Sequence, residues 1–242
     1  MRIQQQDLDY LSGQSYSNGR EIKFAFDRID NRYFSRTEFL RDIAREKNII
    51  HVGFVDHDID SIQKKINKNK WLHSVLDQVA TRCFGVDILK DEVDFVRHSL
   101  GFDDVGVADI TAAIPQQTKG TDWDYVMIPE VLEHIDNPVA FLSGIKKVWT
   151  GHAKKIVITV PNAFTPSNYR FARRKVEKIN TDHRFWFTPY TLAKVVMQAG
   201  LRVDSIVMCH HGRVKKRAFF RNLWFKRNPL LRSDIVMLVD FE

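Results

Sequence analysis

The sequence predicts an α/β fold, a doubly wound, mostly parallel seven-stranded sheet with an antiparallel edge strand. Two observations support this prediction. Short runs that are apolar throughout alternate with segments of helical spacing, as expected for parallel strands buried on both faces. The last two runs are joined by a basic, aromatic segment that Pro229 interrupts, without a convincing helix. This connection favours an antiparallel pair at the sheet edge.

Each element follows from its local pattern. The strand candidates, rich in β-branched residues, are Ile49–Val55, Cys83–Ile88, Val105–Ala108, Tyr125–Ile128, Ile156–Val160, Val203–Met208 and Ile235–Val239. Helical spacing of apolar residues predicts helices at 37–44, 71–79, 93–96, 139–148 and 192–199. We expect an N-terminal extension that contains a helix, residues 1–44, and a single domain, residues 45–242.

Composition narrows the class of protein. A chain of 242 residues that is 44% hydrophobic can bury a sizeable core. The sequence contains neither a secretory leader nor a run near the ~18 apolar residues of a membrane span, so we expect a cytoplasmic protein. Cys83 and Cys209 lie in apolar runs without a C-x-x-C spacing. Their placement fits a reducing compartment, and no ligand cluster indicates a metal.

The formal net charge of +7 is concentrated in two places. Segment 212–232 contains many lysines and arginines and no acid, and a second basic run spans 170–178. Aromatic residues accompany the first segment, which would suit an anionic membrane surface or a lipid-linked phosphate. The alternative is an exposed, solvated loop between edge strands.

Candidate ligand-binding residues follow the strands. In an open parallel sheet, ligands bind beyond the carboxyl ends of the strands. Gly53 follows the first strand, where it would let a ligand approach the backbone closely. Asp87 and Asp109 end the second and third strands, where a carboxylate can bond ribose hydroxyls or an adenine amino group. Either acid could instead cap a helix or turn.

The fourth strand is followed by the most specific motif. Glu130-Val-Leu-Glu-His-Ile-Asp-Asn-Pro138 resembles the E-V-L-E-H-x-x-x-P signature of class I S-adenosylmethionine-dependent methyltransferases of the "methyltransferase type 11" kind. Segments 155–162 and 181–190 resemble the fifth strand and the D-H-x-x-x-F-[ST] element of these proteins. The resemblance covers roughly residues 45 to 240 and implies a Rossmann-like methyltransferase fold.

The resemblance also implies a cofactor, S-adenosylmethionine, and its site. Gly53 would lie under the methionine portion, Asp87 on the ribose, Asp109 near the adenine and Glu130 beside the pocket. The complete implied cofactor site comprises His51, Gly53, Asp87, Ile88, Asp109, Ile110, Pro129 and Glu130.

The first loop departs from the family pattern. Instead of an acid and three alternating glycines, the chain has His51, Gly53, Val55 and His57. A polar insertion at 58–70 also separates the first two strands. The insertion could form a lid that supplies contacts to the methyl donor, or the site could have become a non-catalytic scaffold; we favour the lid.

The expected chemistry is an in-line methyl transfer, in which a base removes the acceptor proton where needed. His134 and His183 are the candidate catalytic bases, and either could instead be a structural histidine. Nearby aromatic residues could stack on an acceptor or belong to the core. We expect a hydroxyl of a sugar, glycan or small metabolite, as in polysaccharide biosynthesis. RNA methylation is a weaker alternative, because no RNA-binding module is recognisable.

Overall fold

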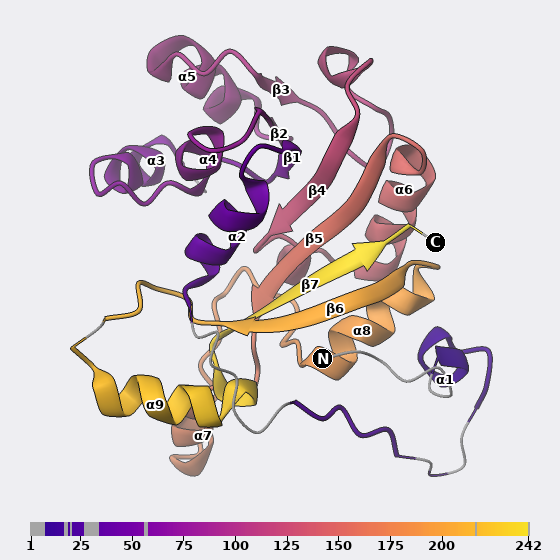
Figure 1. Ribbon diagram of the computed structural model, residues 1–242, viewed down its shortest axis with the longest axis vertical. Helices are drawn as coiled ribbons and strands as arrows, with labels where there is room; N and C mark the ends of the chain where they lie inside the picture. Colours follow the sequence, from indigo (N-terminus) through magenta and orange to yellow (C-terminus); the bar gives the residue numbers. More distant parts are fainter. Residues whose placement is uncertain are drawn as a thin grey trace.

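The computed structural model describes residues 8–16, 19, 21–26, 34–55, 58–215 and 217–241. Its centre is a seven-stranded sheet of order β3-β2-β1-β4-β5-β7-β6, in which β7 alone runs antiparallel to its neighbours (Figure 1). The strands are β1 Asn48–Val52, β2 Arg82–Asp87, β3 Val105–Val107, β4 Trp123–Pro129, β5 Ala153–Pro161, β6 Arg202–Cys209 and β7 Asp234–Asp240. The predicted doubly wound sheet and its antiparallel edge are confirmed.

Helices cover both faces of this sheet. They are α1 Leu8–Ser12, α2 Arg36–Ala44, α3 Ile59–Ile66, α4 Leu72–Asp77, α5 Lys90–Leu100, α6 Pro138–Trp149, α7 Pro166–Arg173, α8 Pro189–Gln198 and α9 Phe219–Arg227. On one face, α2 and α4 bury Leu40 and Leu76 against Met127. On the other, α6 and α8 bury Leu142 and Leu192 in the main core. None of the helices described here is long and apolar enough to cross a membrane.

The start of α2 is fixed by local and distant bonds. Ser35 and Glu38 form a capping box, in which the backbone N–H of each residue donates to the side chain of the other. The Arg36 backbone N–H then donates to the carbonyl oxygen of His210, just after β6, at 2.9 Å. These bonds bring the amino end of α2 to the carboxyl end of the sheet and place Arg36 there.

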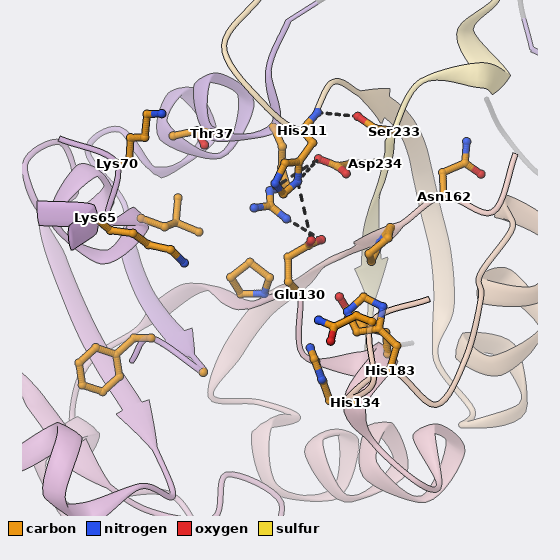
Figure 2. Close-up of a pocket in the computed structure, with 18 of the residues that line it drawn as sticks. Thr37, Lys65, Lys70, Glu130, His134, Asn162, His183, His211, Ser233 and Asp234 are labelled. Atoms are coloured by element: carbon orange, nitrogen blue, oxygen red, sulfur yellow. Dashed lines mark hydrogen bonds and ion pairs between the residues drawn. The ribbon is translucent and has the colours of Figure 1, made fainter. Parts of the chain in front are cut away.

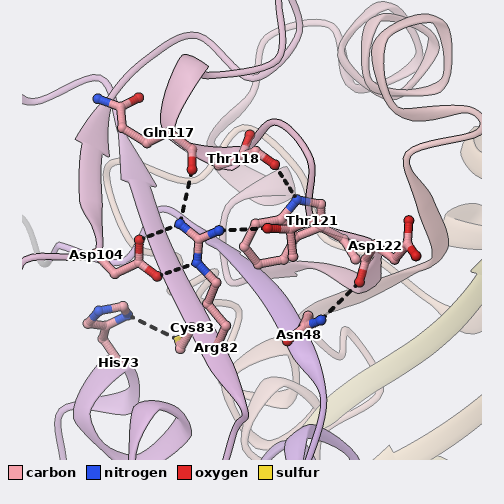
Figure 3. Close-up of polar contacts among 10 residues, drawn as sticks. Asn48, His73, Arg82, Cys83, Asp104, Gln117, Thr118, Thr121 and Asp122 are labelled. Atoms are coloured by element: carbon pink, nitrogen blue, oxygen red, sulfur yellow. Dashed lines mark hydrogen bonds and ion pairs between the residues drawn. The ribbon is translucent and has the colours of Figure 1, made fainter.

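The amino end of the sheet is held by a polar network centred on Arg82 (Figure 3). The Arg82 guanidinium donates to both carboxylate oxygens of Asp104, at 2.6 and 2.7 Å. It also donates to Thr121 Oγ1 at 2.7 Å and to the Gln117 carbonyl at 3.0 Å. A bidentate Arg–carboxylate pair has fixed geometry, so this network ties the loop before β3 to the loop before β4.

Three helices differ from the sequence prediction. The expectation of no helix between the last two strands was wrong, because α9 lies there. Its last residue is Arg227, and Pro229 follows the helix end, where proline is tolerated. The insertion after β1 contains α3, capped by Asp58. The start of the basic run lies in α7, which begins with Pro166 after the Thr165 cap.

Candidate active site

A cavity of about 590 Å³ opens at the carboxyl ends of the central strands (Figure 2). Its walls come from the loop after β1, the amino end of α2, the turn after β4, the loops that follow β5 and β6, and the start of β7. Of the predicted site residues, it is lined by His51, Gly53, Pro129, Glu130, His134 and His183. The fold therefore gathers residues from distant parts of the sequence at the edge where ligands bind in such sheets.

The loop after β1 requires its single glycine. Gly53 has a φ of +66°, and a Cβ atom built on it would lie 2.5 Å from Val131 Cγ2. No larger residue fits this conformation without displacing Val131. The turn also ends β1 at Val52, three residues earlier than predicted. Glycine therefore lets the backbone of this loop pack against Val131 of the turn after β4.

His51 lines the cavity, but its side chain is buried and uncharged. Its side chain is buried, and its Nδ1 atom lies 3.2 Å from Nδ1 of His73. Burial, followed by the neighbouring His73, lowers the pKa of His51 well below its usual value. The imidazole is therefore neutral at physiological pH. His57, the other histidine of this loop, lies outside the described residues.

Asp87 organises the turn after β2. Its Oδ1 atom accepts hydrogen bonds from the backbone N–H groups of Ile88 at 2.7 Å and Leu89 at 3.2 Å. Burial raises the pKa of Asp87 above its ordinary value. Leu89 lines the cavity, whereas Asp87 and the exposed Ile88 do not. A bond from either residue to the methyl donor stays a prediction.

Asp109 organises the turn after β3 in the same way. Its Oδ1 atom accepts from the backbone N–H of Thr111 at 2.8 Å and from the Thr111 hydroxyl at 2.7 Å. Ile110 is buried in the main core, and its carbonyl oxygen accepts from the Trp149 indole at 3.1 Å. Both residues lie outside the cavity wall. Their contact with an adenine ring also stays a prediction.

Glu130 anchors a charged network above the cavity. Its backbone has a φ of +56°, and its N–H donates to the Thr159 carbonyl at 2.9 Å. Arg36 Nη1 lies 2.5 Å from Glu130 Oε1, and Arg36 Nε lies 3.9 Å from Asp234 Oδ2. His211 Nδ1 lies 3.4 Å from the same Asp234 oxygen (Figure 2). A non-glycine residue in left-handed conformation marks a position that its surroundings hold firmly.

The acids of this network raise the pKa values of its two basic groups. Burial acts to lower the pKa of Arg36, but Glu130 and Asp234 outweigh it and raise that pKa. The hydrogen bond to Asp234 raises the pKa of His211. The sequence patterns did not indicate Arg36, His211 or Asp234 as site residues. They come from three separate segments, and no local motif marks them.

A second cluster lies beside this network and contains both predicted catalytic histidines. The rings of His134 and His183 meet edge to face, with centroids 4.8 Å apart, and Nδ1 of His134 lies 3.1 Å from the Asp182 carbonyl oxygen. Glu133 completes the cluster and is 1% exposed. Neither of its carboxyl oxygens has a hydrogen-bond partner among the described residues.

Glu133 has an unusual protonation equilibrium. Burial, and then repulsion from Glu130, raises its pKa to about 8. A buried carboxyl group that titrates near neutrality is suited to exchanging a proton with a ligand. One ligand atom from each of Glu133, His134 and His183 lies within 4.8 Å of the others, so the cluster could also hold a divalent cation. Glu133 belongs to the quoted motif but was not predicted as a site residue.

The insertion after β1 contributes the opposite wall. Ile62 of α3 is fully buried, and Trp71 Nε1 donates to the carbonyl oxygen of Phe54 at 3.1 Å. This anchoring places Lys65 and Lys70 on the cavity wall. Lys65 lies across the cavity from His134 and His183 (Figure 2). Contact between this segment and a methyl donor stays a prediction.

The aromatic residues after His183 divide between two roles. Trp186 lines the cavity, whereas Phe187 is buried in the main core. Phe185 and Tyr190 are partly exposed, and Tyr190 packs edge to face on Phe24. Both alternatives for this segment, a pocket wall and a core, therefore apply to different side chains of it.

The chain matches one family model, described as a methyltransferase domain, over residues 33–206. No curated protein matches it. Among solved structures, the small RNA methyltransferase HEN1 is 15% identical, with a TM-score of 0.54. That alignment covers 92% of this chain but only 27% of HEN1, so this chain spans about a quarter of that structure's length.

Two further structures have shorter alignments. A SAM-dependent methyltransferase from Aquifex aeolicus is 13% identical over 86% of this chain and 90% of its own, with a TM-score of 0.49. Magnesium protoporphyrin IX methyltransferase from Synechocystis PCC 6803 is 12% identical over 84% of this chain and 82% of its own, with a TM-score of 0.48. At such identities, structural likeness bears on the fold alone. The family match over most of the chain carries the assignment: this protein belongs to the methyltransferase domain family and is a class I methyltransferase that uses S-adenosylmethionine.

Proposed function

We propose that this enzyme methylates a hydroxyl group of a sugar, glycan or small metabolite, and that the cluster of Glu133, His134 and His183 receives the hydroxyl proton. One observation carries the proposal: a buried carboxyl group without a hydrogen-bond partner faces the cavity beside two imidazoles. A buried polar group left unbonded is costly, so its retention favours a role with a ligand. A hydroxyl group would donate the missing hydrogen bond.

The cavity residues fit the cofactor at the loop after β1. Gly53 lines the cavity with backbone atoms alone, and Val131 occupies the position that a side chain would take, so the loop needs glycine here. We place the methionine portion of the methyl donor over Gly53, with Glu130 beside it. Lys65 and Lys70 would face its carboxylate. The bound cofactor supplies an electrophilic methyl group on a sulfonium sulfur, which leaves as a neutral thioether.

The remaining chemistry belongs to the acceptor and the cluster. The acceptor oxygen forms a bond to the methyl carbon as the carbon–sulfur bond breaks, and the hydroxyl proton passes to the cluster and then to solvent. Alignment of the acceptor lowers the barrier, because the displacement requires an in-line approach. Ionisation of Glu133 strengthens proton acceptance, so kcat is expected to rise as the pH increases through about 8.

The test is a transfer assay with isotopically labelled S-adenosylmethionine and a panel of free sugars, nucleotide sugars, oligosaccharides and RNA. We expect a methyl ether on a sugar acceptor. Glu133→Gln should lower kcat by about 10²–10⁴-fold with unchanged affinity for the methyl donor. Asp103→Asn, which removes an exposed carboxylate, is the matched control and should leave both unchanged. Transfer to RNA alone, or an unchanged kcat in Glu133→Gln, would reject the proposal.

The three-residue cluster also supports a second candidate, a divalent cation that binds the acceptor hydroxyl at the same place. The two versions differ in their response to a chelator. Proton transfer to the cluster alone predicts full activity in EDTA. Loss of activity in EDTA and its recovery with Zn²⁺ or Mn²⁺ would assign the cluster as a ligand set.

A further inference from the structure

Two surface helices, α7 and α9, lie together beyond the carboxyl ends of the parallel strands (Figure 1). Neither helix contains a buried residue. Short helices in water usually depend on burying an apolar face against the rest of the protein. The α9 helix contains Phe219, Phe220 and Trp224 but buries no residue. Its aromatic side chains are therefore available to another partner.

The two helices enclose an apolar groove of about 600 Å³. Phe164, Tyr169 and Ala172 line one side, and Trp224, Leu230 and Leu231 line the other. The groove is next to the active-site cavity, because Thr165 and Asn168 line both. A ligand seated in the groove would therefore lie beside the place where methyl transfer occurs.

The surface around the groove combines exposed aromatic groups with positive charge. The side chains of Tyr169, Phe219 and Phe220 are 67%, 65% and 84% exposed. The same two helices contribute basic side chains, none of which forms an ion pair within the described part of the chain, namely Arg170, Arg173, Arg221, Lys226 and Arg227. Neither helix contains an acid. Such a surface is typical of proteins that lie on anionic bilayers.

We propose that α7 and α9 dock on an anionic phospholipid membrane, with their aromatic side chains at the boundary between headgroups and acyl chains. The basic side chains would bind lipid phosphates, and the apolar groove would take an acyl chain. Docking would turn the mouth of the adjacent cavity toward an acceptor held at the membrane. The inference does not depend on the chemistry of that acceptor, and its test does not use enzymatic activity.

The groove favours a membrane over RNA as the partner. RNA recognition also uses aromatic and basic side chains, but bases stacked on aromatic rings need polar groups for their edges. The groove is lined almost wholly by apolar side chains, with Thr165 and Asn168 at the border with the cavity. Phe219 and Phe220 also meet each other edge to face rather than forming a flat stacking platform.

The test is co-sedimentation with vesicles of phosphatidylcholine, with and without phosphatidylglycerol. We expect binding only with phosphatidylglycerol, and weaker binding as salt is raised. The double variant Phe219→Ser with Phe220→Ser should weaken binding by about tenfold or more. Val107→Ser is its control, because Val107 is 45% exposed on β3, at the other edge of the sheet.

A charge variant tests the second part of the surface. Arg221→Gln with Lys226→Gln should also weaken vesicle binding by about tenfold, whereas Lys119→Gln with Lys147→Gln removes the same charge elsewhere and should not. All four positions in these variants carry side chains outside the core, and circular dichroism checks that the fold is retained. The proposal would be overturned if the protein bound no vesicles or bound both vesicle types equally. It would also be overturned if the protein bound RNA but not vesicles, and if these variants abolished the RNA binding.

Discussion

At the amino end of the sheet, the Arg82 guanidinium donates to Asp104, Thr121 and Gln117, and its partners lie at normal hydrogen-bond distances. At the carboxyl end, Glu133 is almost fully buried, and neither of its oxygens accepts a bond from the described residues. Polar groups that only stabilise a fold are normally bonded within it. We infer that one end of the sheet stabilises the fold, whereas the other end keeps hydrogen-bonding capacity for a ligand.

Removal of Arg36 should have the largest effect on stability. Arg36→Met removes the cation that lies 2.5 Å from the partly buried Glu130 and one of the two basic groups beside the buried Asp234. A buried charge that loses its partner costs about 3–5 kcal/mol of unfolding free energy. Urea unfolding measures this change. The control is Arg41→Met on the same helix, whose exposed pair with Asp42 is worth less than about 1 kcal/mol. Equal effects of the two variants would contradict the buried network.

A side chain at position 53 should damage both stability and binding of the methyl donor. Gly53→Ala forces a contact with Val131 at a left-handed φ, for an expected cost of about 1–3 kcal/mol. Calorimetric titration with S-adenosylhomocysteine should show at least about tenfold weaker binding. Gly101→Ala is a matched control, because Gly101 has a φ of +73° and open space around its Cβ position. Gly101→Ala should lose stability only through its left-handed backbone conformation, and it should bind S-adenosylhomocysteine with unchanged affinity.

Loss of the Arg82 network should have the smallest effect and no consequence for binding. Arg82→Ala removes hydrogen bonds at a partly exposed site, for an expected loss of about 1–2 kcal/mol. The affinity for S-adenosylhomocysteine should not change, since the network lies at the opposite end of the strands. Thermal unfolding and calorimetry measure the two quantities. Weaker binding of S-adenosylhomocysteine by Arg82→Ala would contradict the inference that only the carboxyl end of the sheet serves the ligand.

The sheet could be predicted because its strands are buried on both faces and read as apolar runs. The α9 helix could not, because its apolar residues are spread around the helix and do not form one face. Glu130 and His134 of the motif at 130–134 line the cavity, and their roles in binding and catalysis stay predictions. The cavity also contains Arg36, His211 and Asp234. These residues meet through the contact of α2 with the end of β6 and the pairing of β6 with β7, which join segments far apart in the sequence.

The buried carboxyl group at the carboxyl end of the sheet also makes the stability of the protein depend on pH. Glu133 has a pKa of about 8 when folded, raised by burial, against about 4.3 when unfolded. Between these values the folded protein holds a proton that the unfolded chain has released, so Glu133 makes stability fall as the pH rises through this window. Glutamine cannot ionise, so Glu133→Gln avoids this loss.

The most direct test is urea unfolding of the wild type and Glu133→Gln at several pH values between about 5 and 8. We expect the variant to become progressively more stable than the wild type as the pH rises, by a total on the order of a few kcal/mol. Asp103→Asn, at an exposed position, should show no such trend. A difference between Glu133→Gln and the wild type that does not change with pH would contradict a buried carboxyl group reserved for a ligand.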